Sequence, residues 1–299
     1  MFAQRSGWRR WGAASVLLTV LIGGWVIGLT RESTSVAAQS SPTASESVVV
    51  LVQTGKQFYP VVQALYALTG RNFNQSVRWA KLTPSVVLRT SDTQTAARVQ
   101  AVLQTVGASV EIDPFYMTVE NVTVIRGRGL LVTGPVGRGN LSVREAVELV
   151  GLRVAPIKSL ATDVQRLDNP QAPLKPGDRL GVMLSQVNEA DVKRGMLLVK
   201  AGTLAARTLF QAEIYVTTIT EGGQGKAIAR NAPAQFRLWN TDYTGALQLP
   251  AGTTNALPGG VTEVTVMLNT PAPVENGSWF TIYQQNRPIG FGIVSAPLK

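Results

Sequence analysis

The sequence predicts a multidomain chain with an N-terminal transmembrane helix, a small α/β domain and two all-β barrels. Three observations support this fold class. An uncharged apolar run extends from Trp11 to Thr30. Residues 47–114 then alternate between β-branched runs and amphipathic helical patterns. Beyond Pro114, turn residues interrupt short alternating runs roughly every eight to twelve residues, which is typical of β-barrels.

The composition limits the chemistry that the chain can perform. At 299 residues, 45% of them hydrophobic and 15% charged, the chain can form several small cores. It contains no Cys and no His, which removes thiolate nucleophiles, thiolate metal sites and the usual general base near neutral pH. We therefore predict that the protein is not an enzyme and holds no cofactor or metal. The formal charge of +10 is spread along the chain and favours only weak attraction to an anionic polymer or surface.

Residues 1–30 predict a membrane anchor. The run from Trp11 to Thr30 is about 20 residues long, which at ~1.5 Å per residue spans a ~30 Å hydrocarbon layer. Arg5, Arg9 and Arg10 precede it, so the positive-inside rule keeps the N-terminus in the cytoplasm. We expect a single-pass membrane protein whose domains are extracytoplasmic.

A secretory signal peptide is the alternative interpretation of the same segment. The small residues at 35–38 offer a cleavage site, and the protein would then be secreted. In both interpretations residues 31–46, which are rich in Ser, Thr and Ala, form a flexible linker.

Residues 47–114 predict an α/β domain with the element order βααβαβ. We expect strands at residues 47–53, 86–88 and 109–112. The first helix begins near Pro60 and ends at Gly70, and the second covers residues 74–82. Ser91 and Gln94 form a capping box that predicts the start of the third helix.

This order and the segment 103–112 (Leu-Gln-Thr-Val-Gly-Ala-Ser-Val-Glu-Ile) resemble the C-terminal domain of the bacterial ribosomal stalk protein, which recruits translational GTPases. The family's cationic residues on the first helix correspond to Phe58, Gln63 and Tyr66 here, and its Gly-Leu-Gly-Leu turn corresponds to residues 70–73. A neutral, aromatic face thus replaces the factor-binding face, so we expect the fold without the recruitment.

Residues 116–204 and 207–299 resemble domains 2 and 3 of elongation factor Tu. The resemblance implies two barrels of the translation-factor type. The motifs fall in the family's order: Gly127 to Gly134, Val147 to Gly151, Pro176 to Leu184, Val192 to Met196 and Leu198 to Thr203 in the first; Phe210 to Val216, Glu221 to Gly223, Gln235-Phe236, Thr241 to Gly245, Leu249-Pro250, Pro258-Gly259 and Phe280 to Ile282 in the second.

The family's GTPase domain has no counterpart in this sequence. A phosphate loop needs Gly-x-x-x-x-Gly-Lys followed by Ser or Thr, and that pattern does not occur. Gly225-Lys226-Ala227 lacks the first glycine and the hydroxyl. We therefore predict that the protein does not hydrolyse GTP.

The resemblance also implies binding of aminoacyl-tRNA, through contact positions that have counterparts in this sequence. The family's Arg-His pair corresponds to Gln224-Gly225, its Tyr-Arg-Pro to Ala232-Pro233-Ala234, and an acidic contact is replaced near Pro173. Each lost cation weakens binding to phosphates, so we expect little affinity for tRNA.

Two further sets of residues are candidates for a site. Glu145 and Glu148 form a carboxylate pair on a predicted strand or turn, and we interpret them as solvated side chains on an outer or edge face. Trp239 and Trp279 are candidates for an aromatic ligand groove, but aromatic residues of a barrel more often fill the interior or a domain interface. We predict no catalytic, cofactor-binding or metal-binding residue.

The sequence thus favours a non-catalytic, membrane-anchored binding or scaffold protein, whose partner is an unidentified protein or anionic polymer. The alternative is a translation-associated protein that binds the ribosome, aminoacyl-tRNA or a translation factor.

Overall fold

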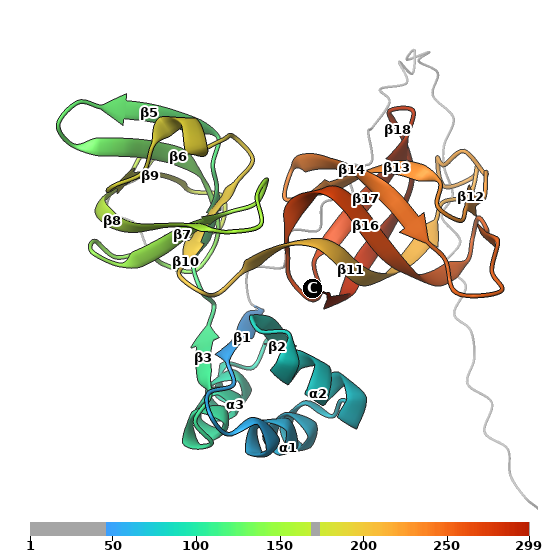
Figure 1. Ribbon diagram of the computed structural model, residues 1–299, viewed down its shortest axis with the longest axis horizontal. Coiled ribbons are helices and arrows are strands. Elements are labelled where there is room, and N and C mark those ends of the chain that lie inside the picture. Colours follow the sequence, from blue (N-terminus) through green and yellow to red (C-terminus); the bar gives the residue numbers. More distant parts are fainter. Residues whose placement is uncertain (1–45, 169–173, 299) are drawn as a thin grey trace, which may run out of the picture. The chain divides into compact units, whose positions relative to one another are not determined.

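The computed structural model describes residues 46–168 and 174–298, which lie within one compact unit, Pro42–Lys299 (Figure 1). An α/β domain is followed by two β-barrels, which confirms this part of the predicted fold class. The predicted transmembrane segment and most of the predicted linker lie outside the described residues. Among the described residues, no helix has both the length and the apolar character needed to cross a membrane.

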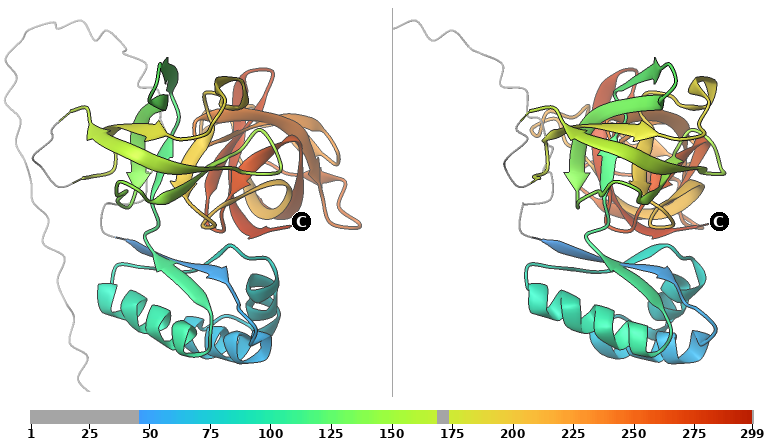
Figure 2. Two further views of the ribbon diagram at one scale, coloured as in Figure 1. Left: turned by 60° about the vertical axis from the view of Figure 1, so that its left-hand side comes forward. Right: turned by 90° about the vertical axis from the view of Figure 1, so that its left-hand side faces the viewer.

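The α/β domain has the predicted order βααβαβ. Its three strands form an antiparallel sheet with the order β2-β1-β3, and its helices lie on one face of that sheet (Figure 2). The elements are β1 (Ser47–Gln53), α1 (Phe58–Thr69), α2 (Phe73–Lys81), β2 (Ser85–Thr90), α3 (Thr93–Thr105) and β3 (Ser109–Ile112).

Local capping sets the helix boundaries, and one predicted cap is wrong. The Asn72 side chain accepts from the Gln75 amide at 2.9 Å and starts α2, while Gly70 ends α1 in the left-handed conformation. The cap of α3 is Asp92 rather than Ser91. The Asp92 carboxylate accepts from the Gln94 amide at 3.0 Å and also from the Thr95 hydroxyl, so it satisfies more donors than a serine hydroxyl would.

Strand β1 is buried on both faces because both are covered. Val49 and Leu51 pack into the core with the three helices. Val48 and Val50 face the other way with Val86. On that second side, Asn276 of the second barrel donates its amide to the Val86 carbonyl at 3.3 Å. A strand buried on both faces is apolar throughout, as the run of valines shows.

The first barrel is a ring of six strands with a seventh attached. The sheet order is β4-β10-β7-β8-β9-β6-β5, and an additional pairing of β4 with β6 closes the ring. Its elements are β4 (Tyr116–Thr118), β5 (Asn121–Ile125), β6 (Gly129–Arg138), β7 (Ala146–Val150), β8 (Ile157–Arg166), β9 (Arg179–Leu184), the 3₁₀ turn η1 (Glu189–Asp191) and β10 (Leu197–Lys200).

Gly134 permits a close approach of two strands where this ring closes. Strand β6 points Leu130, Val132 and Val136 into the core by simple alternation. At Gly134 a Cβ atom would lie 1.8 Å from the Thr118 carbonyl oxygen. Only glycine permits this close approach between β6 and the end of β4.

The second barrel is closed, with the strand order β11-β16-β14-β13-β17-β18. Alternating residues of these strands fill one interior. The elements are β11 (Ala205–Val216), β13 (Pro233–Leu238), β14 (Thr241–Gln248), β16 (Val261–Val274), β17 (Trp279–Gln284) and β18 (Arg287–Pro297), with a small ladder of β12 (Ile228–Ala229) and β15 (Asn255–Ala256).

Candidate functional surfaces

The two barrels meet through apolar side chains and backbone hydrogen bonds. The Trp239 ring of the second barrel lies edge-on to Tyr116 of the first, with centroids 5.0 Å apart, and its indole donates to the Pro273 carbonyl of its own barrel at 2.9 Å. The Leu152 amide donates to the Pro271 carbonyl at 2.8 Å. Trp239 therefore lies at the domain interface, one of the two positions that we predicted for it.

Trp239 occupies an unusual backbone conformation for a bulky residue. Its φ is +51° and that of Asn240 is +63°, so the pair forms the two-residue turn between β13 and β14. Such turns favour Asn and Gly at both positions. The strain at a tryptophan is offset by its indole hydrogen bond and its ring contact in the interface.

A buried carboxylate links all three domains. The Glu275 carboxylate, whose side chain is 5% exposed, accepts from Arg89 of β2 at 3.2 Å and from Arg138 of β6 at 3.0 Å. Arg138 also donates to the Pro114 carbonyl at 3.2 Å and stacks over Tyr116, 5.3 Å from the ring centroid. We call Arg89, Arg138 and Glu275 the ionic node.

The ionic node was not predicted from the sequence, because its residues are far apart in the chain. The available signal was weak: Glu275 is a lone carboxylate directly after the apolar end of β16. Burial against this node also raises the pKa of the Tyr116 hydroxyl.

The predicted carboxylate pair has structural partners. The Glu145 carboxylate accepts from the Ser142 amide at 3.0 Å and pairs with Lys200 at 3.4 Å. The Glu148 carboxylate accepts from the Gly202 amide at 3.0 Å. Glu148 is buried, so its interpretation as a solvated residue was wrong. It lies on β7 between β8 and β10, where its carboxylate closes the turn that follows β10.

Trp279 is not in a barrel interior or an interface, which corrects the expectation. Phe280 and Ile282 of β17 point inward, so alternation places Trp279 on the outer wall, where it is 57% exposed. Its ring lies 6.0 Å from that of Phe291, which in turn lies 5.4 Å from that of Tyr215. We call Tyr215, Phe291 and Trp279 the barrel row.

Glu221 fixes one end of the barrel row. Its carboxylate accepts from the Thr218 amide at 2.9 Å and from the Tyr215 hydroxyl at 2.7 Å. These hydrogen bonds, with that of the Thr218 amide the most important, lower the pKa of Glu221. The hydrogen bond to Glu221 likewise raises the pKa of the Tyr215 hydroxyl.

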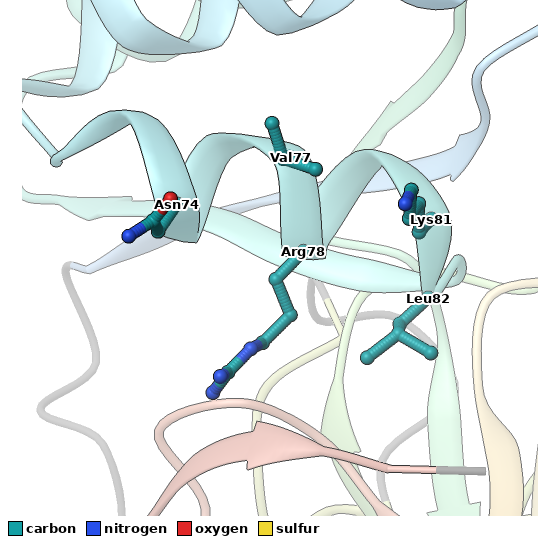
Figure 3. A pocket seen from close by; sticks show the side chains of 5 residues that line it. All are labelled: Asn74, Val77, Arg78, Lys81 and Leu82. Carbon is teal, nitrogen blue, oxygen red and sulfur yellow. The ribbon is translucent and has the colours of Figure 1, made fainter.

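Two open hollows lie beside α2. Figure 3 shows one of about 500 Å³ on this helix, lined by Asn74, Val77, Arg78, Lys81 and Leu82. Arg78 donates to the Gln211 side chain of the second barrel. A second groove of about 600 Å³ lies between α2 and that barrel. No group of three or more acidic residues capable of holding a metal occurs in the part of the chain that the structure describes.

A comparison with known protein families identifies the second barrel. Residues 203–296 match the elongation factor Tu C-terminal domain. The two barrels, of six ring strands each, fit elongation-factor-Tu-like domains 2 and 3. The chain is thus translation-factor-like over this region, and the resemblance of the α/β domain to the stalk protein stays a prediction.

The positions aligned with the tRNA contacts of elongation factor Tu are placed in part. Gln224-Gly225 lies in the loop between β11 and β12, and Ala232-Pro233-Ala234 leads into β13. Pro173 lies outside the described residues. The only side chain of this set that bears hydrogen-bonding groups is that of Gln224, which has no charge to bind a phosphate.

Proposed function

We propose that the protein is a non-catalytic binding or scaffold protein that presents elongation-factor-Tu-like barrels from a membrane anchor, without GTPase activity. The observation that carries the proposal is the barrel row on the outer wall of the second barrel. Exposed aromatic side chains that contact each other form an apolar platform, and such platforms are common at protein-binding surfaces. The missing phosphate loop and the neutral side chains at the tRNA-contact positions support the proposal.

Crosslinking followed by affinity purification from cell membranes tests the barrel row. We expect a reproducible partner with the wild-type chain and its loss with Trp279→Ala. The matched control is Leu257→Ala, which truncates another exposed apolar side chain of the same barrel. Recovery of the same partner by Trp279→Ala, or of no reproducible partner by the wild-type chain, would count against the proposal.

The membrane location is part of the proposal and has its own test. The apolar run from Trp11 to Thr30, preceded by three arginines, supports an anchor with extracytoplasmic domains. A protease added outside spheroplasts should digest the domains, and full protection would exclude this topology. Recovery of the chain in the soluble extracytoplasmic fraction would favour the cleaved signal peptide.

The match to the elongation factor Tu C-terminal domain also motivates a second candidate, a translation-associated protein. This candidate predicts co-sedimentation with ribosomes and salt-sensitive retention of aminoacyl-tRNA on filters. An absence of both would exclude it. An extracytoplasmic location would do so as well, because it separates the domains from the ribosome.

A further inference from the structure

The first two helices of the α/β domain carry exposed aromatic side chains. Tyr59 and Tyr66 lie seven residues apart on the same side of α1 and are 63% and 55% exposed. Phe73, at the start of α2, is 54% exposed. Gln63 lies between the tyrosines and donates to the Tyr59 hydroxyl at 3.2 Å. We call Tyr59, Tyr66 and Phe73 the α1 face.

The α1 face is not needed for the core of its domain. Val61, Val62 and Leu65 of α1 form the buried side of the helix and pack against the sheet. The opposite face of the sheet contacts the second barrel through Asn276. Tyr59 and Tyr66 therefore lie on the side of α1 that the core of the domain leaves uncovered.

The charged residues next to the α1 face are cationic. The α/β domain, residues 47–114, contains six lysines and arginines, of which Arg89 belongs to the ionic node, and three carboxylates. Each carboxylate has its own partner: Asp92 caps α3, Glu111 pairs with Lys200 at 3.0 Å and Asp113 accepts from the Val48 amide at 2.7 Å. None of the three helices contains an acidic residue. Two exposed cations flank helix α1: Lys56 precedes it in the chain and Arg71 follows it.

The barrel row offers a useful contrast, because carboxylates accompany its aromatic rings. Glu221 accepts from Tyr215, and exposed Glu213 lies two residues before Tyr215 on β11. An anionic surface would be repelled there. Of the two aromatic surfaces, the α1 face is therefore the one whose neighbouring cations, Lys56 and Arg71, would attract an anionic surface.

We propose that the α1 face lies on the surface of a membrane and contacts anionic lipid headgroups. Tyrosine side chains have an apolar ring and a polar hydroxyl, which suits the boundary between headgroups and acyl chains. Lys56 and Arg71 contact the anionic headgroups on either side of them. This inference rests on the proposed membrane anchoring.

The length of chain before the domain makes the contact easy to reach. Sixteen residues, 31–46, separate Thr30 from Ser47. Fully extended, they reach at most ~55 Å. A tether of this length holds the domain near the membrane at an effective concentration of roughly millimolar, so a weak interfacial contact is sufficient.

The absence of cysteine permits a test with one label in the full-length chain. Tyr66→Cys is labelled with an environment-sensitive fluorophore. The chain is then reconstituted into nanodiscs of phosphatidylcholine, either alone or with about one quarter phosphatidylglycerol. Val154→Cys, at an exposed position of the first barrel, provides the matched control.

In anionic discs we expect a blue-shifted emission from position 66, quenched by spin-labelled lipids, whereas position 154 should emit as in water. Lys56→Gln combined with Arg71→Gln should lower the quenching at position 66 by about half, since each cation near an anionic surface contributes to binding. Lys226→Gln in the second barrel should leave it unchanged.

The outcomes separate this inference from the anchoring on which it rests. If the chain co-elutes with the discs while position 66 emits as position 154 does, the α1 face does not contact lipid and the inference is overturned. If the chain fails to co-elute with discs of either composition, the anchoring is overturned as well. Equal quenching in neutral and anionic discs would overturn the role of Lys56 and Arg71.

Discussion

The two junctions in this molecule are built from different interactions. The barrels meet through the ring contact of Trp239 with Tyr116, the Leu152–Pro271 backbone hydrogen bond and the Arg138–Glu275 ion pair. The α/β domain joins them through Arg89, the third member of the ionic node. Apolar contacts stabilise in proportion to the area that they remove from water. A buried ion pair offsets its own desolvation and stabilises little, but it strongly disfavours any arrangement in which one partner is left alone.

The ionic node therefore acts on specificity more than on stability. Arg89, Arg138 and Glu275 come from three domains, so the complete node forms only when all three domains are in place. The ring contact between Trp239 and Tyr116 needs no such match of charges. We expect the two junctions to respond differently to the loss of a single side chain.

Loss of the Glu275 carboxylate should have the largest effect. Glu275→Leu leaves Arg89 and Arg138 without their carboxylate at a site where both are mostly buried, which costs about 3 kcal/mol. Hydrogen exchange should show faster opening of β2 and of the segment around Asn276.

Glu263→Leu is the matched control. Glu263 is an exposed residue of β16, the strand that ends just before Glu275, and it lies opposite Glu213 of β11. It should change exchange at the ionic node very little. Equal exchange in Glu275→Leu and in the control would show that the node does not hold the junction.

Two tryptophans provide the next comparison. Trp239→Ala removes a half-buried ring and its hydrogen bond from the barrel junction and should cost about 2 kcal/mol. Trp279→Ala removes an exposed ring from the outer wall and should cost less than ~0.5 kcal/mol. Urea denaturation followed by circular dichroism measures both, and equal costs would contradict the assignment of Trp239 to the junction.

The α/β order and the two barrels were predictable from sequence because their signals are local. Alternating apolar residues and turn glycines mark each strand, and the resemblance to elongation factor Tu covers both barrels. The outward orientation of Trp279 was also predictable, because Phe280 and Ile282 point inward and neighbouring residues of a strand alternate. The expectation that aromatic residues are buried led to the wrong interpretation.

The junctions were not predictable in this way. Arg89 and Arg138 lie 186 and 137 residues from Glu275, and no local pattern pairs side chains over such distances. The residue that caps α3 was also not predictable from the sequence. Ser91 and Asp92 are both good capping residues, and which of them caps the helix depends on whose side chain reaches the Gln94 amide.

A glycine at the barrel junction gives a third effect, similar in size to that of Trp239. Gly151 has a φ of +110°, and a Cβ atom there would lie 3.1 Å from the Pro273 ring of the second barrel. Gly151→Ala should cost about 2 kcal/mol through backbone strain and crowding together. Gly177→Ala is the control, since its φ is +95° and its added Cβ would meet no atom within 4 Å. Equal losses of stability would show that the contact with Pro273 is unimportant.

The smallest effect concerns pH and lies outside both junctions. Hydrogen bonds from the Thr218 amide and the Tyr215 hydroxyl lower the pKa of Glu221 below 4.5, its ordinary value. A lowered pKa in the folded state means that the contribution to stability is complete above the unfolded pKa and is lost as the pH falls through the folded one. Glu221→Gln should therefore weaken the pH dependence of stability below about pH 4.5 and leave stability near neutral pH almost unchanged.

Because the carboxylate is exposed, NMR titration of Glu221 with and without Tyr215→Phe is the sensitive measurement. The pKa should rise in Tyr215→Phe, and an unchanged value would show that the hydroxyl at the end of the barrel row does not bind the carboxylate in solution.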